Sequence, residues 1–299
     1  MPKFPQRELE RIINLICLKN HWKVEWFADG WICAITAAKQ PQYIFGYNFF
    51  INDVSSSKIC SDKAATSEIL NRAKIPAFVH YYFRNHFYHE QELIATFKKL
   101  KNNVVIKPNE GTSGIAVLHC TKQKTFLKEA IRILTEYQTL AISPFYAYEN
   151  EYRLVIYQQH VVIHYQKHRP YLIGDGKHSL AQLIKIHKIH NAEILPIKNI
   201  PKNGEKIPLT WKHNLGQGAK ITENIPLPLL NRLTKLALKV QKLLGIKFFS
   251  IDFAVTNQWI KVVEVNSGVM LEHFAGINRK NFQRVYDLYF RVLKDALKR

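Results

Sequence analysis

Two acids and an amide stand in strongly apolar surroundings near the C-terminal end of the chain. Asp252 lies in the run FFSIDFAV, and Glu264 and Asn266 lie in the run WIKVVEVN. Core strands favour apolar residues, so acids in these runs require a specific reason. Two carboxylates about 5 Å apart repel each other unless a cation or a proton lies between them. Carboxylate and amide oxygens suit Mg²⁺, and these three residues are therefore candidate metal ligands.

The two runs are predicted to form a β-hairpin. A three-residue turn over 257–259 would place Asp252 directly opposite Glu264, with Asn266 on the same face. A two-residue turn would separate these side chains. The alternative interpretation is a solvated edge strand whose acids face water, and the pattern by itself leaves both open.

A second candidate site combines a lysine with a glycine-containing loop. Lys107 ends the apolar strand VVIKP at 104–108, and the loop NEGTSG follows before a second predicted strand, IAVLHC at 115–120. Backbone N–H groups of such a loop can close around a phosphate, to which lysine adds a charge. The order G-x-x-x-x-G-K-[ST] of a P-loop is absent. An ordinary hairpin turn is the alternative.

Basic residues recur on a predicted hairpin at 151–170, whose polar turn falls at 158–159. Arg153, Lys167 and Arg169 on its strands would suit an anionic intermediate, although a solvated basic face is the alternative. The long loop region 196–226 contains WKHNLGQGA, in which Asn214 stands beside two glycines. Loops of this length in compact proteins are usually functional.

The elements that must position these residues mix helices and strands without strict βαβ alternation, which predicts an α+β fold. A polar break is expected at 52–58. Helices are predicted, from their apolar spacing and capping residues, over 7–20, 61–73, 125–137, 227–244 and 280–297.

Composition limits the class of protein. The chain has 299 residues, is 47% hydrophobic and carries 43 Lys and Arg against 23 Asp and Glu, a net charge of +20. This charge favours an anionic partner without choosing among nucleic acid, nucleotide and acidic substrate. Four scattered cysteines argue against a disulfide framework or a zinc site. With no apolar run near 18 residues and no secretory signal, we expect a cytoplasmic protein that does not bind membranes.

Taken in order, these motifs resemble those of the ATP-grasp superfamily of carboxylate–amine ligases, most closely the cyanophycin synthetase and glutamate-ligase-like branch. The resemblance covers about residues 58–275 and rests on SDKAATSEILNRAKIP, VVIKPNEGTSGIAV, EYRLVIY, GDGKHSLAQLI, WKHNLGQGA and the pair SIDFA and VVEVNSG. It implies a nucleotide held between two α+β subdomains: a short N-terminal domain at 1–58, a nucleotide-binding subdomain at 59–140 and a metal-containing subdomain at 141–299.

The resemblance also implies roles for individual residues. Asp252, Glu264 and Asn266 would bind Mg²⁺, with two ions expected and Mn²⁺ as a substitute. Arg153 and Arg169 would lie near an acyl phosphate as catalytic groups. The implied ATP-binding residues are Lys63, Lys107, Glu110, Gly111, Thr112, Ser113, Gly114, Ile115, Lys167 and Asn214. The expected reaction joins a small-molecule carboxylate to an amine, on amino acids or small peptides, and dimers are common in the superfamily.

Departures and rival functions accompany this resemblance. Pro144 or Phe145 stands where relatives often have an acid near adenine, and Ser250 stands where some D-alanine ligases have arginine, which argues against D-Ala–D-Ala ligation.

The basic charge favours an acidic substrate such as a glutamyl compound. The alternatives are a kinase acting on a small molecule and a nucleic-acid-binding protein. No nucleic-acid-binding motif is present, so a stable nucleic-acid partner is not expected.

Overall fold

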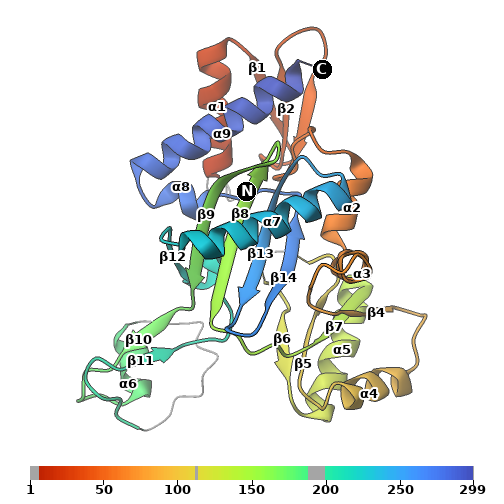
Figure 1. Ribbon diagram of the computed structural model, residues 1–299, viewed down its shortest axis with the longest axis vertical. Coiled ribbons are helices and arrows are strands. Elements are labelled where there is room, and N and C mark those ends of the chain that lie inside the picture. Colours follow the sequence, from red (N-terminus) through yellow and green to blue (C-terminus); the bar gives the residue numbers. More distant parts are fainter. Residues whose placement is uncertain (1–6, 112–113, 188–198, 299) are drawn as a thin grey trace.

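The computed structural model describes residues 7–111, 114–187 and 199–298, and a five-stranded antiparallel sheet lies at its centre (Figure 1). The strand order is β12-β9-β8-β13-β14. Its strands are β8 (Asn150–Tyr157), β9 (His160–His168), β12 (Lys220–Thr222), β13 (Phe248–Val255) and β14 (Ile260–Asn266). The predicted hairpin at 151–170 is therefore confirmed, and Gln158 and Gln159 form its turn.

Helices cover the two faces of this sheet differently. On one face, α7 (Leu227–Leu244) packs its buried Leu233 and Val240 against β8 and β13. On the other face lie α1 (Glu8–Asn20), α8 (Glu272–Gly276) and α9 (Arg279–Leu297). Because side chains alternate along a strand, Asp252 points away from α7, on the face of Phe248.

A small N-terminal sheet extends the second of these cores. It contains β1 (Lys23–Phe27), β2 (Ile32–Thr36) and β3 (Gln42–Phe45), all antiparallel. Cys33, Ile35 and Ile44 point from it into the core that α1 and α9 share. All four cysteines are buried and free.

A separate four-stranded sheet lies beside β14. Its order is β4-β7-β5-β6, with β4 (Tyr81–Arg84), β5 (Val104–Pro108), β6 (Leu118–Cys120) and β7 (Thr139–Pro144), and it is packed by α4 (Glu90–Lys99) and α5 (Gln123–Tyr137). Segment 76–78 links it to the central sheet, since Phe78 N donates to Val262 O at 2.9 Å. The domain boundary expected at 140 falls within β7, so we propose that it lies after Pro144.

Two local predictions were wrong. The expected polar break at 52–58 is instead the start of α2 (Val54–Ser61), because the Asp53 carboxylate accepts from Ser56 N at 2.8 Å and caps the helix. The strand expected from 115 begins only at Leu118, since residues 114–116 form a turn in which Ala116 has φ +54°. The helix predicted over 61–73 is α3 (Lys63–Arg72), and the Asp62 side chain caps it by accepting from Ala65 N.

A small unit projects from the end of β9 (Figure 1). It consists of β10 (Tyr171–Ile173), α6 (Leu180–Ile186) and β11 (Lys206–Pro208) around four buried leucines, Leu172, Leu180, Leu183 and Leu209. Within the described ranges, every helix is too short or too polar to span a membrane.

Candidate active site

The hairpin of β13 and β14 brings the predicted acids together, but its turn differs from the predicted one. Asp252 pairs with Glu264 and Ser250 pairs with Asn266, as the metal-site hypothesis required. The turn itself is short, because Thr256 N donates to Trp259 O at 2.9 Å and Val255 pairs with Ile260. A β-bulge after Asp252 then shifts the register by one residue. The three-residue turn was therefore wrong, while the opposition of the two acids is confirmed.

The register of the sheet places four site residues in one row across four strands. Tyr165 lies opposite Arg153, Arg153 opposite Asp252, and Asp252 opposite Glu264. The Arg153 guanidinium donates to both oxygens of Asp252, from Nε to Oδ1 at 2.7 Å and from Nη2 to Oδ2 at 2.6 Å. It also lies 3.6 Å from Glu264 Oε1, which accepts from Asn266 Nδ2 at 3.0 Å. The row is thus a chain of charges and hydrogen bonds.

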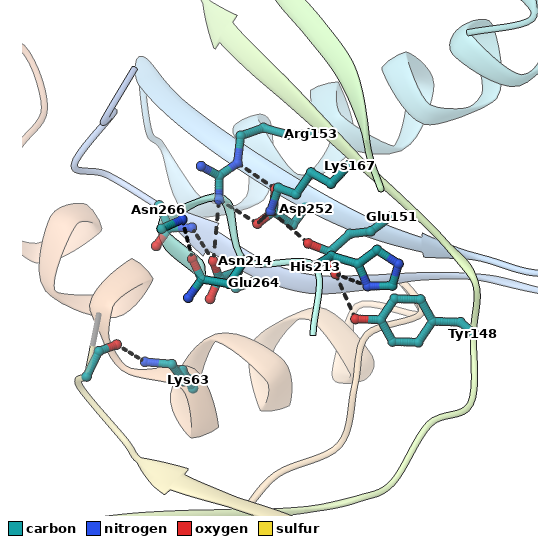
Figure 2. A network of polar contacts seen from close by, with 12 residues as sticks. Lys63, Tyr148, Glu151, Arg153, Lys167, His213, Asn214, Asp252, Glu264 and Asn266 are labelled. Carbon is teal, nitrogen blue, oxygen red and sulfur yellow. Dashed lines mark hydrogen bonds and ion pairs between the residues drawn. The ribbon is translucent and has the colours of Figure 1, made fainter. Parts of the chain in front are cut away.

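Lys167 joins this row to a second group of polar residues, which Figure 2 shows beside it. Its Nζ donates to Asp252 Oδ2 and to Glu151 Oε1, both at 2.7 Å. Glu151 Oε2 accepts from Tyr148 Oη at 2.7 Å and lies 3.6 Å from His213 Nδ1. Glu151, Tyr148 and His213 were not predicted as site residues. The position of Glu151 two residues before Arg153 on one strand face could have identified it.

Burial makes these charges depend on one another. Burial alone would raise the pKa of Asp252, which is 1% exposed, but Arg153 and Lys167 hold that pKa well below its ordinary value. Burial and Arg153 oppose the charge of Lys167, yet Asp252 and Glu151 raise the pKa of this lysine. Removing one partner of such a buried set leaves the others uncompensated, which is costly.

The two predicted phosphate-binding lysines approach the site from α3 and β5. Lys63 Nζ donates to the carbonyl oxygens of Asn109 at 3.1 Å and Gly111 at 2.5 Å. Burial, with the Lys63 charge as a second cause, lowers the pKa of Lys107 to about 8. Among the residues that the structure describes, none accepts a hydrogen bond from Lys107 Nζ. A buried ammonium group of this kind is suited to an anionic ligand.

Two loops meet beside these lysines. Gly114 has φ +71°, and a Cβ at this position would lie 2.3 Å from Asn214 Nδ2. Asn214 caps the short 3₁₀ helix Leu215–Gln217, accepting from Gly216 N at 2.8 Å. Thr112 and Ser113, which were also predicted to contact phosphate, lie outside the described residues.

The resemblance implies that the loop of Gly114 contacts ATP, so the Gly114→Ala variant is expected to weaken ATP binding by about tenfold while the protein stays folded. The added methyl group meets Asn214, and φ +71° is strained for alanine, so the two loops must separate. Titration with ATP and a thermal melt measure the two effects. Gly204→Ala is the control, because its φ is also positive and nothing lies within 4 Å. Equal effects of both variants would exclude a role for the loop contact.

These residues line one cleft of about 400 Å³. The predicted residues that line it are Lys63, Lys107, Glu110, Gly111, Gly114, Ile115, Arg153, Lys167, Asn214, Asp252, Glu264 and Asn266. Arg169 does not: its guanidinium donates to the carbonyl oxygen of Tyr148 and lies over that ring at 6.0 Å. Beyond Lys107 the cleft has an end that we call the lid end, formed by Val105, Pro144, Phe145, Tyr146 and Trp211. It includes Pro144 and Phe145, the two candidates from the sequence for the position at which the resemblance implied an acid.

Comparisons with known proteins agree on the fold. No family model matches the chain. The glutathione biosynthesis bifunctional protein GshAB of Clostridium perfringens is 23% identical, over 94% of this chain and 38% of its own. A bifunctional glutathione synthetase from Pasteurella multocida superposes with a TM-score of 0.55 at 16% identity, over 94% of this chain and 44% of that one. A D-alanine–D-alanine ligase from Bacillus anthracis gives 0.56 at 17%, over 83% and 69%. The chain has the ATP-grasp fold.

The fold agrees with the ATP-grasp fold and the α+β class predicted from the order of the motifs. The chain spans less than half the length of the two bifunctional relatives that it matches. These similarities establish the fold, so the activity of this chain must be argued from its own cleft.

The ATP-grasp fold implies a divalent metal ion, and the oxygen donors of the cleft fit one. Glu264 is accessible, with 31% of its side chain exposed, and Asn266 beside it keeps its carbonyl oxygen free of that hydrogen bond. Asp252 has three of its four acceptor positions filled by Arg153 and Lys167, which leaves one on Oδ1. Among the described residues, no three His, Cys, Asp or Glu side chains form a metal cluster. The expected set contains only two such acids, Asp252 and Glu264.

Proposed function

We propose that this protein is an ATP-dependent carboxylate–amine ligase that joins a small-molecule acid to an amine. One observation carries the proposal. The cleft collects the buried Lys107 and the partly buried Lys63 on one side and the row from Arg153 to Glu264 on the other. Phosphoryl transfer needs positioned cations and metal ligands more than covalent help, and this cleft contains both.

The proposed reaction has two steps. A carboxylate oxygen of the acid bonds to the γ-phosphorus of ATP while the bond from that phosphorus to the β-bridging oxygen breaks, releasing ADP. The amine nitrogen then bonds to the acyl carbon, the carbon–oxygen bond to phosphate breaks, and the nitrogen loses a proton to solvent. The products are an amide, ADP and inorganic phosphate.

The residues of the cleft have distinct roles in this proposal. Lys107 and Lys63 supply positive charge for the phosphates. Burial by itself opposes that charge, but it strengthens the attraction to a bound phosphate because little water screens it. Arg153 lies 3.6 Å from Glu264 and would therefore lie near the transferring phosphoryl group. Glu264, Asn266 and one oxygen of Asp252 would hold Mg²⁺, which neutralises developing phosphate charge when bound. The lid end, with its aromatic side chains, is suited to the base of the nucleotide.

The test is a product measurement. The full chain is incubated with Mg²⁺ and ATP across a matrix of acids and amines, and ADP, phosphate and new amides are quantified. We expect ADP and phosphate in equal amounts, both dependent on an acid and an amine. A kinase would make ADP without phosphate. Glu264→Gln should abolish turnover, whereas Glu25→Gln, an exposed acid on β1, should not. Full turnover in Glu264→Gln would refute the proposed metal site.

A further inference from the structure

The cleft has a second end, on the side of Asn266 away from the lid end. The segment that follows Asn266 packs on the loop that follows β3, because Ser267 Oγ donates to Asn48 Oδ1 at 2.7 Å and Val269 N donates to Tyr47 O at 3.2 Å. The N-terminal sheet region is thereby fixed against the proposed metal ligands. A substrate whose carboxylate receives the phosphoryl group must place the rest of its structure near this end.

The residues that line this end are mostly aromatic. We call it the aromatic end, formed by Trp31, Tyr47, Tyr165, Met270, His273 and Phe274. The rings of Tyr165 and Phe274 stack at 5.6 Å and are both 1% exposed. Trp31 packs edge-on against Tyr47 at 6.1 Å and is 45% exposed. A fixed stack and an accessible indole ring form a surface suited to apolar or aromatic groups.

The charged groups near this end already have partners within the protein. No Lys, Arg, Asp or Glu is found among the described residues that line the cleft beyond Asn266. Glu272 lies nearby, but its carboxylate accepts from Tyr47 Oη and from the backbone N–H groups of Glu8 and Leu9. Arg7 does not line the cleft, although its guanidinium lies over the rings of Trp31 and Tyr47 at 5.1 and 5.2 Å. It donates to the carbonyl oxygens of Gly46 and Gly30. A second carboxylate on the substrate would therefore lose hydration at a wall that presents no lysine or arginine side chain to it.

Building on the proposed ligase function, we propose that the acid substrate carries an aromatic or large apolar group, which binds against Trp31, Met270 and the Tyr165–Phe274 stack. This reverses the acidic preference that the net charge suggested. The cationic side chains of the cleft lie beside the phosphate-binding residues and the metal ligands, and their charge serves the nucleotide rather than the second substrate. A neutral amino acid with a large apolar side chain is the simplest substrate of this class.

Acid binding and acid activation are measured in parallel on the full chain. The protein, with Mg²⁺ and ADP, is titrated by calorimetry with phenylalanine, leucine and methionine, and with glutamate and aspartate. Separate samples contain Mg²⁺, ATP and hydroxylamine, which traps an acyl phosphate as a hydroxamate and so removes the need to know the amine. We expect the apolar acids to bind about 100-fold more tightly than the acidic ones.

Matched variants assign that preference to the aromatic end. Trp31→Ala should weaken phenylalanine binding by about tenfold or more. Phe27→Ala, on β1 of the same sheet and 47% exposed, does not line the cleft and should change nothing. Met270→Arg adds a cation to the lining of the cleft and should shift preference toward glutamate. Thermal melts check that each variant is folded.

The outcomes separate this inference from the ligase proposal. Selective binding of apolar acids that is lost in Trp31→Ala supports the substrate class, whether or not hydroxamate forms. Glutamate or aspartate binding as tightly as phenylalanine overturns it, as does binding of no acid in the panel, or equal effects of Trp31→Ala and Phe27→Ala. ADP and hydroxamate report separately: their absence with every acid, despite selective binding, refutes the ligase function alone.

Discussion

Asp252→Asn is expected to lower the free energy of unfolding by about 3–5 kcal/mol and to reduce ATP turnover by at least about 100-fold. Asp252 is 1% exposed and accepts three hydrogen bonds, from Arg153 and Lys167. The amide carries no charge, so two buried cations lose their principal counterion. Urea unfolding followed by circular dichroism measures the first effect, and ADP release measures the second.

The Glu264→Gln variant is the matched comparison, because Glu264 faces Asp252 across the hairpin but is far more exposed. It should lose turnover to a similar extent while its free energy of unfolding changes by less than about 0.5 kcal/mol. A native stability for Asp252→Asn would contradict the buried charge network. A stability loss of equal size in both variants would show that exposure does not separate their roles.

The stabilisation that the Asp252 carboxylate provides should depend on pH. The pKa of Asp252 is lowered in the folded protein, so the unfolded state binds more protons as pH falls below its ordinary pKa of about 3.9. The stabilisation is therefore fully present above that pH and is lost as pH falls toward the folded-state pKa. The difference between the native protein and Asp252→Asn should accordingly shrink below about pH 4.

Lys107→Met should raise the free energy of unfolding, in contrast to Asp252→Asn, and still abolish activity. Lys107 is buried, and its pKa falls from 10.5 to about 8, which corresponds to a cost of about 3 kcal/mol for its charge at neutral pH. Methionine removes that cost and fills a similar volume, so a gain of about 2–3 kcal/mol is expected at pH 7. ATP binding should fall by about 100-fold, because the phosphates lose a buried cation.

The pH dependence tests the cause of that gain. Between about pH 8 and pH 10.5 the unfolded protein binds the Lys107 proton and the folded protein does not, so native stability rises with pH. The advantage of Lys107→Met should therefore decrease through this range. Lys235→Met on α7, at an exposed position, is the control and should change stability little at either pH. A destabilised Lys107→Met would show that the lysine is compensated in the folded state.

The apolar periodicity of the sequence and the order of its motifs were enough to predict most of the long helices and the fold of this protein. Apolar spacing predicted α1, α5, α7 and α9 within one or two residues at each end, because each helix buries one continuous stripe. The order of the motifs predicted the ATP-grasp fold, and with it the meeting of Lys107, Asp252 and Glu264. These features are local in sequence, or follow from motifs whose order the fold preserves.

Other features depend on contacts between distant segments and so could not be predicted from patterns. Helix α2 forms because Asp53 caps it and Ser56 bonds to the carbonyl oxygen of Leu244, although its sequence resembles a loop. The lining of the aromatic end by Trp31 and Tyr47 requires the N-terminal sheet to pack beside residues 267–269. Nothing near residue 31 in the sequence indicates that packing.

The hairpin of Asp252 and Glu264 depends both on local sequence patterns and on contacts between distant segments. The sequence alone determined that acids and an amide stand within two apolar strands, which is chemically unusual enough to mark a site. Only the tertiary structure decided how they meet, because a two-residue turn gives the wrong register and a bulge on β14 corrects it. It also decided that Asp252 is largely committed to Arg153 and Lys167, since pairing across strands brings together charges that lie 85 and 99 residues apart.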